Sequence, residues 1–502
     1  MPIETKRRQI LLNAATTFGQ VIGSAVILFC LYRFLIRSIG IEGLGIWSLV
    51  LATTSIVTLA NQGFSTSIVK FVAKYAARES AEDVSALVQT ALISVGLAVA
   101  AISALLYPIA KWLLGIILPA ATLAEAVAIL PYAVASLWIN LIVSVLQSGL
   151  AGYELITECN YVELSGSALY LFAAFLFVPG RGLLGLAYSQ TAVAGLSLLA
   201  TWLLLRRRIP QLPFVPRRWN RKLFREMAGY GLHFQFITAS QALREPVTKA
   251  LLARFGDLAL VGFYDLASRW VVTFRELIVQ ANQVLVPTVS RLRESDPVSI
   301  PRLYRESYRL IFFLAIPSSA FLIALSPLVS QFWIGRFEPI FISFVALLAV
   351  GWLVNILANP AYVVALGTGA LKWVSVGCAM TAILNAGLGF LAGMRWGGTA
   401  VVGASVFSLA IGYTIVLAAY HLENRVSFAQ LLPKESLGIV FASLVGASVL
   451  LPFFSLSGDR NQLSFPITAI TLGAFAITIA VPMWMHPLRK RLVHWVFSRV
   501  MA

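Results

Sequence analysis

Charged residues are scarce in this chain of 502 residues. Asp, Glu, Lys and Arg make up only 12% of it, whereas 59% of the residues are hydrophobic and the mean hydropathy is +0.85. Soluble domains carry about 25% charged residues. The longest polar run, residues 206–226, is too short to form a soluble domain. The composition therefore predicts an integral membrane protein.

The sequence also lacks the residue patterns of enzymes and metalloproteins. It contains no P-loop, which excludes a built-in ATPase of that type. The three cysteines and four histidines are scattered, without the spacing of a metal site or a disulfide framework. Nucleophile motifs and acid pairs suited to catalysis are absent as well. We therefore expect no enzymatic activity, no metal and no cofactor.

Apolar stretches fill most of the chain and predict an all-α membrane protein with about 14 transmembrane helices. A spanning helix needs about 20 apolar residues. The first stretch is too long for a signal peptide and lacks a cleavage site, so we expect it to be retained. The predicted spans are residues 10–35, 44–69, 84–107, 123–148, 160–178, 183–205, 228–253, 258–287, 304–327, 338–366, 372–393, 397–420, 436–455 and 463–485.

The basic residues orient these spans. If the N-terminus is cytoplasmic, 26 of the 38 Lys and Arg residues fall in cytoplasmic segments, 8 lie outside or near that face, and 4 lie within spans. This bias follows the positive-inside rule and predicts that both termini are cytoplasmic. The net charge of +17 then reflects topology and contact with anionic membrane lipids, and we expect no nucleic-acid partner.

An internal repeat divides the chain. The sequence RSIGIEGLGIWSL, which begins at Arg37, aligns with RFGDLALVGFYDL, which begins at Arg254, at an offset of 217 residues. Ala60-Asn61-Gln62 matches Ala281-Asn282-Gln283 at an offset of 221, and a third match pairs the Pro, Trp and Gly residues at 108–115 with those at 327–335. These matches predict two six-helix lobes in a parallel repeat, an architecture in which transporters bind substrate near the membrane midplane.

The predicted organisation has five parts. They are an N-lobe at 1–205, a basic cytoplasmic linker at 206–227, a C-lobe at 228–420, two extra helices at 421–485 and a basic cytoplasmic tail at 486–502.

Seven charged side chains interrupt the seventh and eighth spans. Each ionised side chain at the centre of a membrane helix costs roughly 2.5–3.5 kcal/mol, so seven without partners would cost on the order of 20 kcal/mol. They must be paired or hydrated, which predicts a water-filled cavity. The seven are Arg244, Glu245, Lys249, Asp265, Arg269, Arg275 and Glu276.

Spacing separates these charges. Glu245 and Lys249 are four residues apart, as are Asp265 and Arg269, so these pairs can neutralise themselves or serve only to hold helices together. Arg244 and Arg275 have acids only at adjacent positions, which do not face each other on a helix. We therefore expect these two cations to be the most available to an anionic substrate. Arg269, about 16 Å into its span and near the midplane, ranks third.

Uncharged polar residues follow helix faces in the same way, as Asn13, Thr17, Gln20 and Ser24 do in the first span. They can line a cavity or form hydrogen bonds between helices. Pro246 lies beside the charges and is expected to bend its helix at a gate. The candidate substrate-binding residues are Arg244, Arg275, Arg269, Lys249, Gln241, Gln20, Asn13 and Asn61, and the candidate ion-pair or gating residues are Glu245, Asp265, Glu276 and Pro246.

Two hairpins carry a family resemblance. IEGLGIWSLVLATTSIVTLANQGFSTSIVKFVAKY, in the first two spans, and LLARFGDLALVGFYDLASRWV, in the seventh and eighth, resemble the polysaccharide transporters of the multidrug/oligosaccharidyl-lipid/polysaccharide exporter superfamily, the Wzx-type flippases. The resemblance implies a two-lobed bundle with a basic central cavity. It also implies that the protein moves a polyprenyl-diphosphate-linked oligosaccharide across the bacterial inner membrane by alternating access. A polysaccharide polymerase and other assembly proteins are further implied partners.

Other functions remain open at this point. A flippase for the peptidoglycan lipid precursor would have a similar cavity. A cation-coupled multidrug exporter of the same superfamily resembles twelve-span proteins with a buried acid in the first lobe, whereas spans 1–3 here contain no Asp or Glu. The intramembrane balance of four cations against three acids also disfavours cationic drugs. The buried charges argue against a membrane scaffold.

Overall fold

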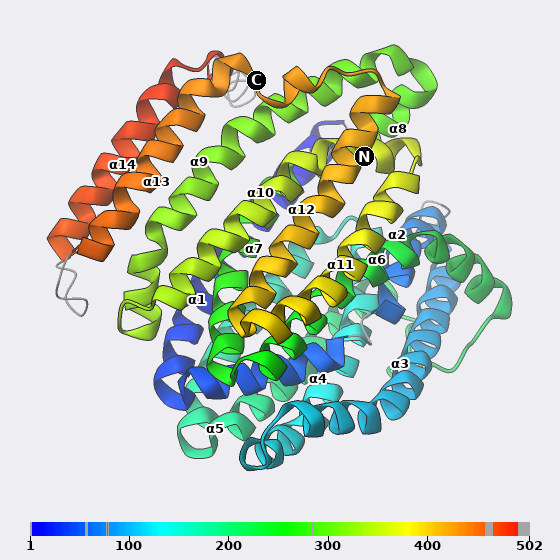
Figure 1. Cartoon of the computed structure of the whole chain (residues 1–502). Coiled ribbons are helices and arrows are strands. Elements are labelled where there is room, and N and C mark those ends of the chain that lie inside the picture. Colours follow the sequence, from blue (N-terminus) through cyan, green and yellow to red (C-terminus); the bar gives the residue numbers. More distant parts are fainter. Residues whose placement is uncertain are drawn as a thin grey trace. The chain divides into compact units, whose positions relative to one another are not determined.

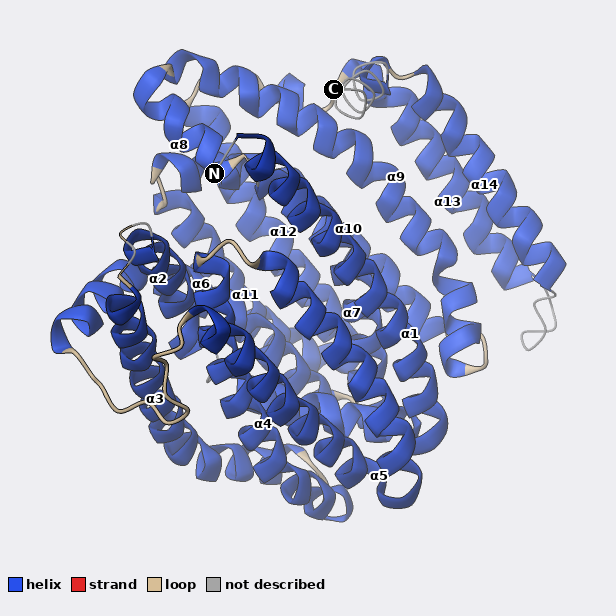
Figure 2. Cartoon of the chain, turned by 180° about the vertical axis from the view of Figure 1, so that it is seen from behind, coloured by secondary structure: helices blue, strands red, loops and turns tan. Residues whose placement is uncertain are grey.

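The computed structural model describes residues 3–55, 59–76, 78, 80–283, 285–456 and 465–489. Over these residues the chain is almost entirely helical and contains no strand (Figures 1 and 2). The predicted all-α membrane fold is confirmed. The helices are α1 (Ile3–Ser55), α2 (Leu59–Ala76), α3 (Ala81–Ile117), α4 (Ala120–Gly152), α5 (Ile156–Arg208), α6 (Arg221–Phe255), α7 (Leu258–Gln283), α8 (Val286–Ser295), α9 (Ile300–Ile334), α10 (Pro339–Thr368), α11 (Lys372–Trp396), α12 (Gly398–Glu423), α13 (Leu437–Leu456) and α14 (Phe465–Met485).

Helices and predicted spans do not correspond one to one. α1 runs through the first span into the second and breaks only at Gly40, and α5 joins the fifth and sixth spans across Gly182. Both glycines have φ in the left-handed region (73° and 54°), which a residue without Cβ adopts at little cost. Conversely, the second span is shared by α1 and α2, and the eighth by α7 and α8.

Nine helical segments of the described chain are long and apolar enough to cross a membrane. Neither α6 nor α7 is among them. These are the two helices that carry the seven charges singled out above, which lower their mean hydropathy.

The chain forms two compact units, residues 1–262 and 263–502, and the boundary falls inside α7 directly after Gly262. The lobes predicted from the repeat place α6 at the start of the second half. In the structure α6 packs against α1, α2 and α3 of the first unit.

The core of the first unit joins α2, α3, α4 and α5, with side chains such as Ile68, Val88 and Val145 fully buried. The segment predicted as a basic linker is attached to this core. Its Ile209 and Leu212 are buried, and the buried Gln89 of α3 accepts hydrogen bonds from the backbone N–H groups of Arg217 and Arg218 at 3.0 and 3.1 Å. The segment therefore has a fixed place on the first unit.

In the second unit α9 packs against α10, α13 and α14, and α12 packs against both α10 and α11. Ala320 and Ala324 of α9 contact Phe475 and Ile479 of α14 in a small apolar cluster. The two C-terminal helices thus belong to the second unit through α9.

Equivalent contacts inside the two units confirm the repeat. In the first unit Gly152 packs so closely on Val72 that an added Cβ would lie 2.6 Å from it, and Gly367 has the same relation to Val289 in the second. Val72 and Val289 are 217 residues apart, so the offset found at the first hairpin holds here too.

This register corrects one match made from the sequence. Ser65 forms a hydrogen bond with Ser144 at 3.3 Å in the first unit, and Asn282 donates to Asn359 at 2.7 Å in the second. At an offset of 217 the counterpart of Asn282 is Ser65. The match of Ala60-Asn61-Gln62 with Ala281-Asn282-Gln283 is therefore wrong by one helical turn, because short polar triplets recur by chance.

Candidate functional site

The charges of α6 lie in the first unit and are mostly buried. Lys249 forms an ion pair with Glu245 one turn earlier, with Nζ 2.9 Å from Oε1. The Lys249 side chain is 6% exposed, whereas Glu245 is 44% exposed. Arg244 is buried, and its backbone carbonyl accepts a hydrogen bond from Thr248. Among these three charges the accessible one is thus the acid.

The charges of α7 show the reverse arrangement. Asp265 lies in a stretch, Val261–Ser268, in which every residue is buried, and its side chain is 2% exposed. Arg269, one turn later, donates from Nε to Asp265 Oδ2 at 2.9 Å, and its side chain is 42% exposed. A buried carboxylate therefore holds an arginine whose side chain remains accessible.

Arg275 is bound more firmly than the sequence predicts. Its Nε donates to Asn355 Oδ1 of α10 at 2.7 Å, and its guanidinium lies over the Trp352 ring at 4.8 Å. It also forms an ion pair with Glu276. The expectation that adjacent residues would not meet is wrong here, because the long arginine side chain reaches around the helix to its neighbour.

A second polar group joins α7 to α9 and α10. Asn282 donates to Asn359, and Ser307 donates to Asn282 Oδ1 at 2.6 Å; all three residues are buried. In the sequence Asn282 is notable only as part of the repeat, and no motif distinguishes Ser307. Nothing local could reveal this group, because its members come from three helices.

The polar face of α1 is joined to α5. Asn13 accepts from Thr157 at 2.8 Å, and Asn160 donates to Thr17 at 2.9 Å. Gln20 donates to Ser24 of its own helix, and Ser24 forms a hydrogen bond with Ser167 of α5. These polar residues therefore form hydrogen bonds between helices, which is one of the two roles expected for this face from the sequence.

The remaining candidates are placed separately. Gln241 is exposed on α6 and Pro246 is buried in the same helix. Asn61 belongs to α2, but its side chain lies outside the described residues. In the part of the chain that is described, no three His, Cys, Asp or Glu residues form a group able to hold a metal ion.

The exposure of their side chains changes the ranking of the candidate substrate-binding cations. Arg244 and Lys249 are buried, and the Arg275 side chain is 18% exposed and fixed on three sides. Arg269, ranked third from the sequence, is the most accessible of the four. Its guanidinium can donate several hydrogen bonds to an anion, and Asp265 holds it in position to do so.

Comparison with known proteins agrees with this architecture. Residues 10–293 match the family model described as "Polysaccharide biosynthesis protein". A search of curated proteins finds no match to the sequence.

Solved membrane transporters have a similar fold. The lipid II flippase MurJ, in an inward closed conformation, is 14% identical with a TM-score of 0.72, over 94% of this chain and 98% of its own. A multidrug resistance MATE family transporter of the MOP superfamily, inward-facing, is 15% identical with a TM-score of 0.70, over 81% and 99%. The Vibrio cholerae MATE transporter VcmN, in the bent form, is 15% identical with a TM-score of 0.58, over 85% and 99%. At these identities the likeness establishes the fold.

Proposed function

Because this chain belongs to the family of polysaccharide biosynthesis proteins, we propose that it is a flippase for a polyprenyl-diphosphate-linked oligosaccharide. The oligosaccharide would be a repeat unit of an O-antigen, a capsule or an exopolysaccharide. The multi-pass fold of the MOP superfamily supports a transport function, and the positive-inside charge bias supports a location in the inner membrane with cytoplasmic termini.

The observation that carries this proposal is the Asp265–Arg269 pair. A diphosphate is an anion rich in acceptor oxygens, and a guanidinium binds such a group through parallel charge-assisted hydrogen bonds. Arg269 is 42% exposed, so a diphosphate can approach it without first unfolding α7. Asp265 neutralises the arginine when no substrate is bound, which lowers the energetic penalty of an empty site.

The same pair provides a way to release the substrate. The diphosphate and Asp265 compete for one guanidinium, so binding is never stronger than the difference between the two interactions. A transporter needs this moderate affinity, because a substrate held too tightly would not leave. Arg275, six residues further along α7, would act as a secondary cation.

Replacing one cation tests the proposal. In a strain that lacks the native gene, Arg269→Gln should reduce surface polysaccharide output about tenfold or more, because a hydrogen bond to a charged group contributes about 1.5–3 kcal/mol. Arg218→Gln is the control, since Arg218 forms an exposed ion pair with Glu82 of α3. Output is compared per amount of each variant found in the membrane, because Arg269→Gln leaves the buried Asp265 without its cation and lowers stability. Normal output from Arg269→Gln would exclude Arg269 as a substrate contact.

One observation favours a second function, cation-coupled export. Glu245 and Glu276 are 44% and 39% exposed, and each is more accessible than its basic partner. Exposed carboxylates on transmembrane helices suit a coupling cation or a cationic substrate. Drug susceptibility of a deletion strain separates the two: increased sensitivity with unchanged polysaccharide would favour the exporter. A flippase for the peptidoglycan precursor shares the diphosphate chemistry, and loss of viability on depletion would indicate that substrate.

A further inference from the structure

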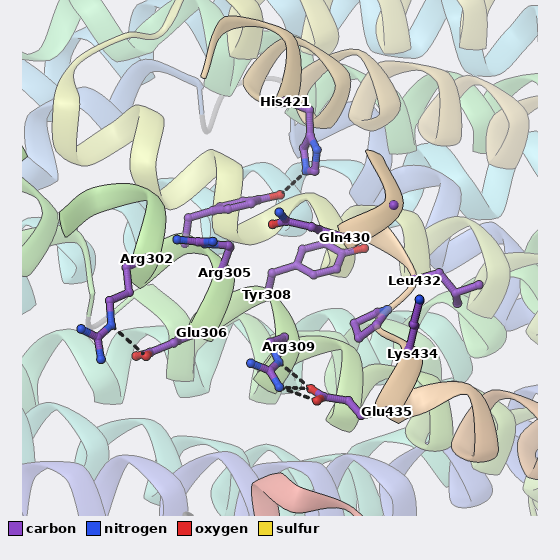
Figure 3. Close-up of a pocket in the computed structure, with 13 residues that line it drawn as sticks. Arg302, Arg305, Glu306, Tyr308, Arg309, His421, Gln430, Leu432, Lys434 and Glu435 are labelled. Carbon is purple, nitrogen blue, oxygen red and sulfur yellow. Dashed lines mark hydrogen bonds and ion pairs between the residues drawn. The ribbon is translucent and has the colours of Figure 1, made fainter. Parts of the chain in front are cut away.

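A pocket of about 400 Å³ lies in the second unit, outside the helices that carry the candidate site (Figure 3). Its walls are the start of α9, the end of α12, and two short 3-10 helices between α12 and α13, η3 (Phe428–Leu431) and η4 (Lys434–Ser436). The topology predicts that this end of the second unit is cytoplasmic. No motif in the sequence indicates this pocket.

The walls are held by contacts across the pocket. Tyr304 forms a hydrogen bond with His421 Nε2 at 2.8 Å, and Tyr308 donates to the backbone carbonyl of Leu431 at 3.0 Å. Arg309 forms a two-point ion pair with Glu435 (Figure 3). Helix α9 and the α12–α13 connection are therefore joined by contacts within the protein itself.

Basic side chains outnumber acids around the pocket. Four basic and two acidic residues line it, which gives a formal net charge of +2 with His421 neutral. Both acids are engaged in ion pairs, Glu435 with Arg309 and Glu306 with Arg302.

Two cations then remain for a ligand. Within the described residues neither Arg305 nor Lys434 forms an ion pair with a carboxylate, and both are exposed. Arg305 projects from the first turns of α9, whose positive end favours anions and not cations. These features suit an anion of about two charges.

The pocket is also flanked by exposed apolar side chains. Leu432 lines it, and Leu422, Phe428 and Leu437 lie close by in sequence on α12, η3 and α13. Between 46% and 67% of the surface of these four residues is exposed. A soluble anion would not cover these apolar side chains, whereas the acyl chains of a lipid would bury them.

We propose that this pocket binds the phosphate group of an anionic phospholipid from the cytoplasmic leaflet, with Arg305 and Lys434 as its principal contacts. The bound lipid would fix the α12–α13 connection against α9. The site does not depend on the proposed transport substrate, since none of its lining residues belongs to α6, α7 or α10.

Native mass spectrometry of the purified full-length chain provides the test. Phosphatidylglycerol is titrated into detergent-solubilised protein, with phosphatidylcholine as the zwitterionic comparison. Wild type is compared with Arg305→Gln/Lys434→Gln and with the charge-matched control Arg218→Gln/Lys372→Gln, whose two exposed basic residues lie outside the pocket. Removing both pocket cations should weaken phosphatidylglycerol binding about thirtyfold, while the control binds like wild type. Thermal midpoints measured without lipid confirm that all three proteins are folded.

Three results would overturn the proposal. Equal loss of phosphatidylglycerol in the pocket variant and the control would mean that only net charge matters. Equal binding of phosphatidylcholine would exclude recognition of an anionic headgroup. Inorganic phosphate at about 10 mM is added in excess over the lipid. If it displaced phosphatidylglycerol from the pocket but left lipid bound elsewhere on the protein, the pocket would be a site for soluble phosphate.

Discussion

A close crossing of α1 and α7 leads to a specific prediction about stability. Gly262, at the start of α7, and Gly45 of α1 are equivalent in the repeat, and each faces a backbone carbonyl of the other helix. A Cβ at Gly262 would lie 2.5 Å from the Ile41 carbonyl oxygen. Carbon–oxygen contacts are normally about 3.3 Å or longer, so Gly262→Ala requires the helices to separate by about 0.8 Å.

The cost follows from comparison with a second glycine. Gly195 of α5 has nothing within 4 Å of an added Cβ, so Gly195→Ala changes only helix propensity, in its favour by up to about 1 kcal/mol. Gly262→Ala has the same propensity gain but adds overpacking, which costs about 1–3 kcal/mol because a backbone carbonyl cannot rotate aside. We expect the thermal midpoint of the detergent-purified Gly262→Ala protein to lie about 2–5 °C below that of Gly195→Ala. Equal midpoints would refute the packing described at this crossing.

Two further predictions concern the second unit. Asn282→Ala should destabilise it by about 1–3 kcal/mol, because Asn359 and Ser307 lose a buried partner, and a thermal shift as small as that of the exposed Gln283→Ala would contradict this. Burial lowers the pKa of His486, which follows α14 and forms hydrogen bonds with Ser436 and the Leu488 N–H group. The unfolded chain therefore binds a proton more readily, so stability is full above about pH 6.5 and falls as the pH drops below it. Thermal midpoints from about pH 7.5 to 5.5 should fall less for His486→Asn than for wild type, and parallel curves would exclude this residue.

Features set by the bilayer or by one helical turn could be predicted from the sequence. The apolar spans follow from the need to satisfy every backbone group within lipid. The Glu245–Lys249 and Asp265–Arg269 pairs follow from helical geometry alone. Contacts between distant residues could not be predicted in this way. Arg275 and Asn355 are 80 positions apart, and nothing near Arg275 indicates that α10 supplies its partner.

The basic pocket also depends on contacts between distant residues. From the sequence alone, the positive-inside rule is the expected reason for its arginines. Their convergence with Lys434 depends on how the α12–α13 connection packs against α9, with partners more than 100 residues apart.

The central claim is that Arg269 contacts the transported anion and is not merely a partner for Asp265. Asp265→Asn, Arg269→Gln and the double variant separate these roles. Asp265→Asn alone should destabilise the protein by about 1–3 kcal/mol, since it removes the carboxylate that a charged donor requires. The double variant should recover much of that stability, because both charges are gone. We expect that the double variant, although stable and correctly inserted, still fails to export polysaccharide; restored export would show that the pair is only structural and that Arg269 does not contact the substrate.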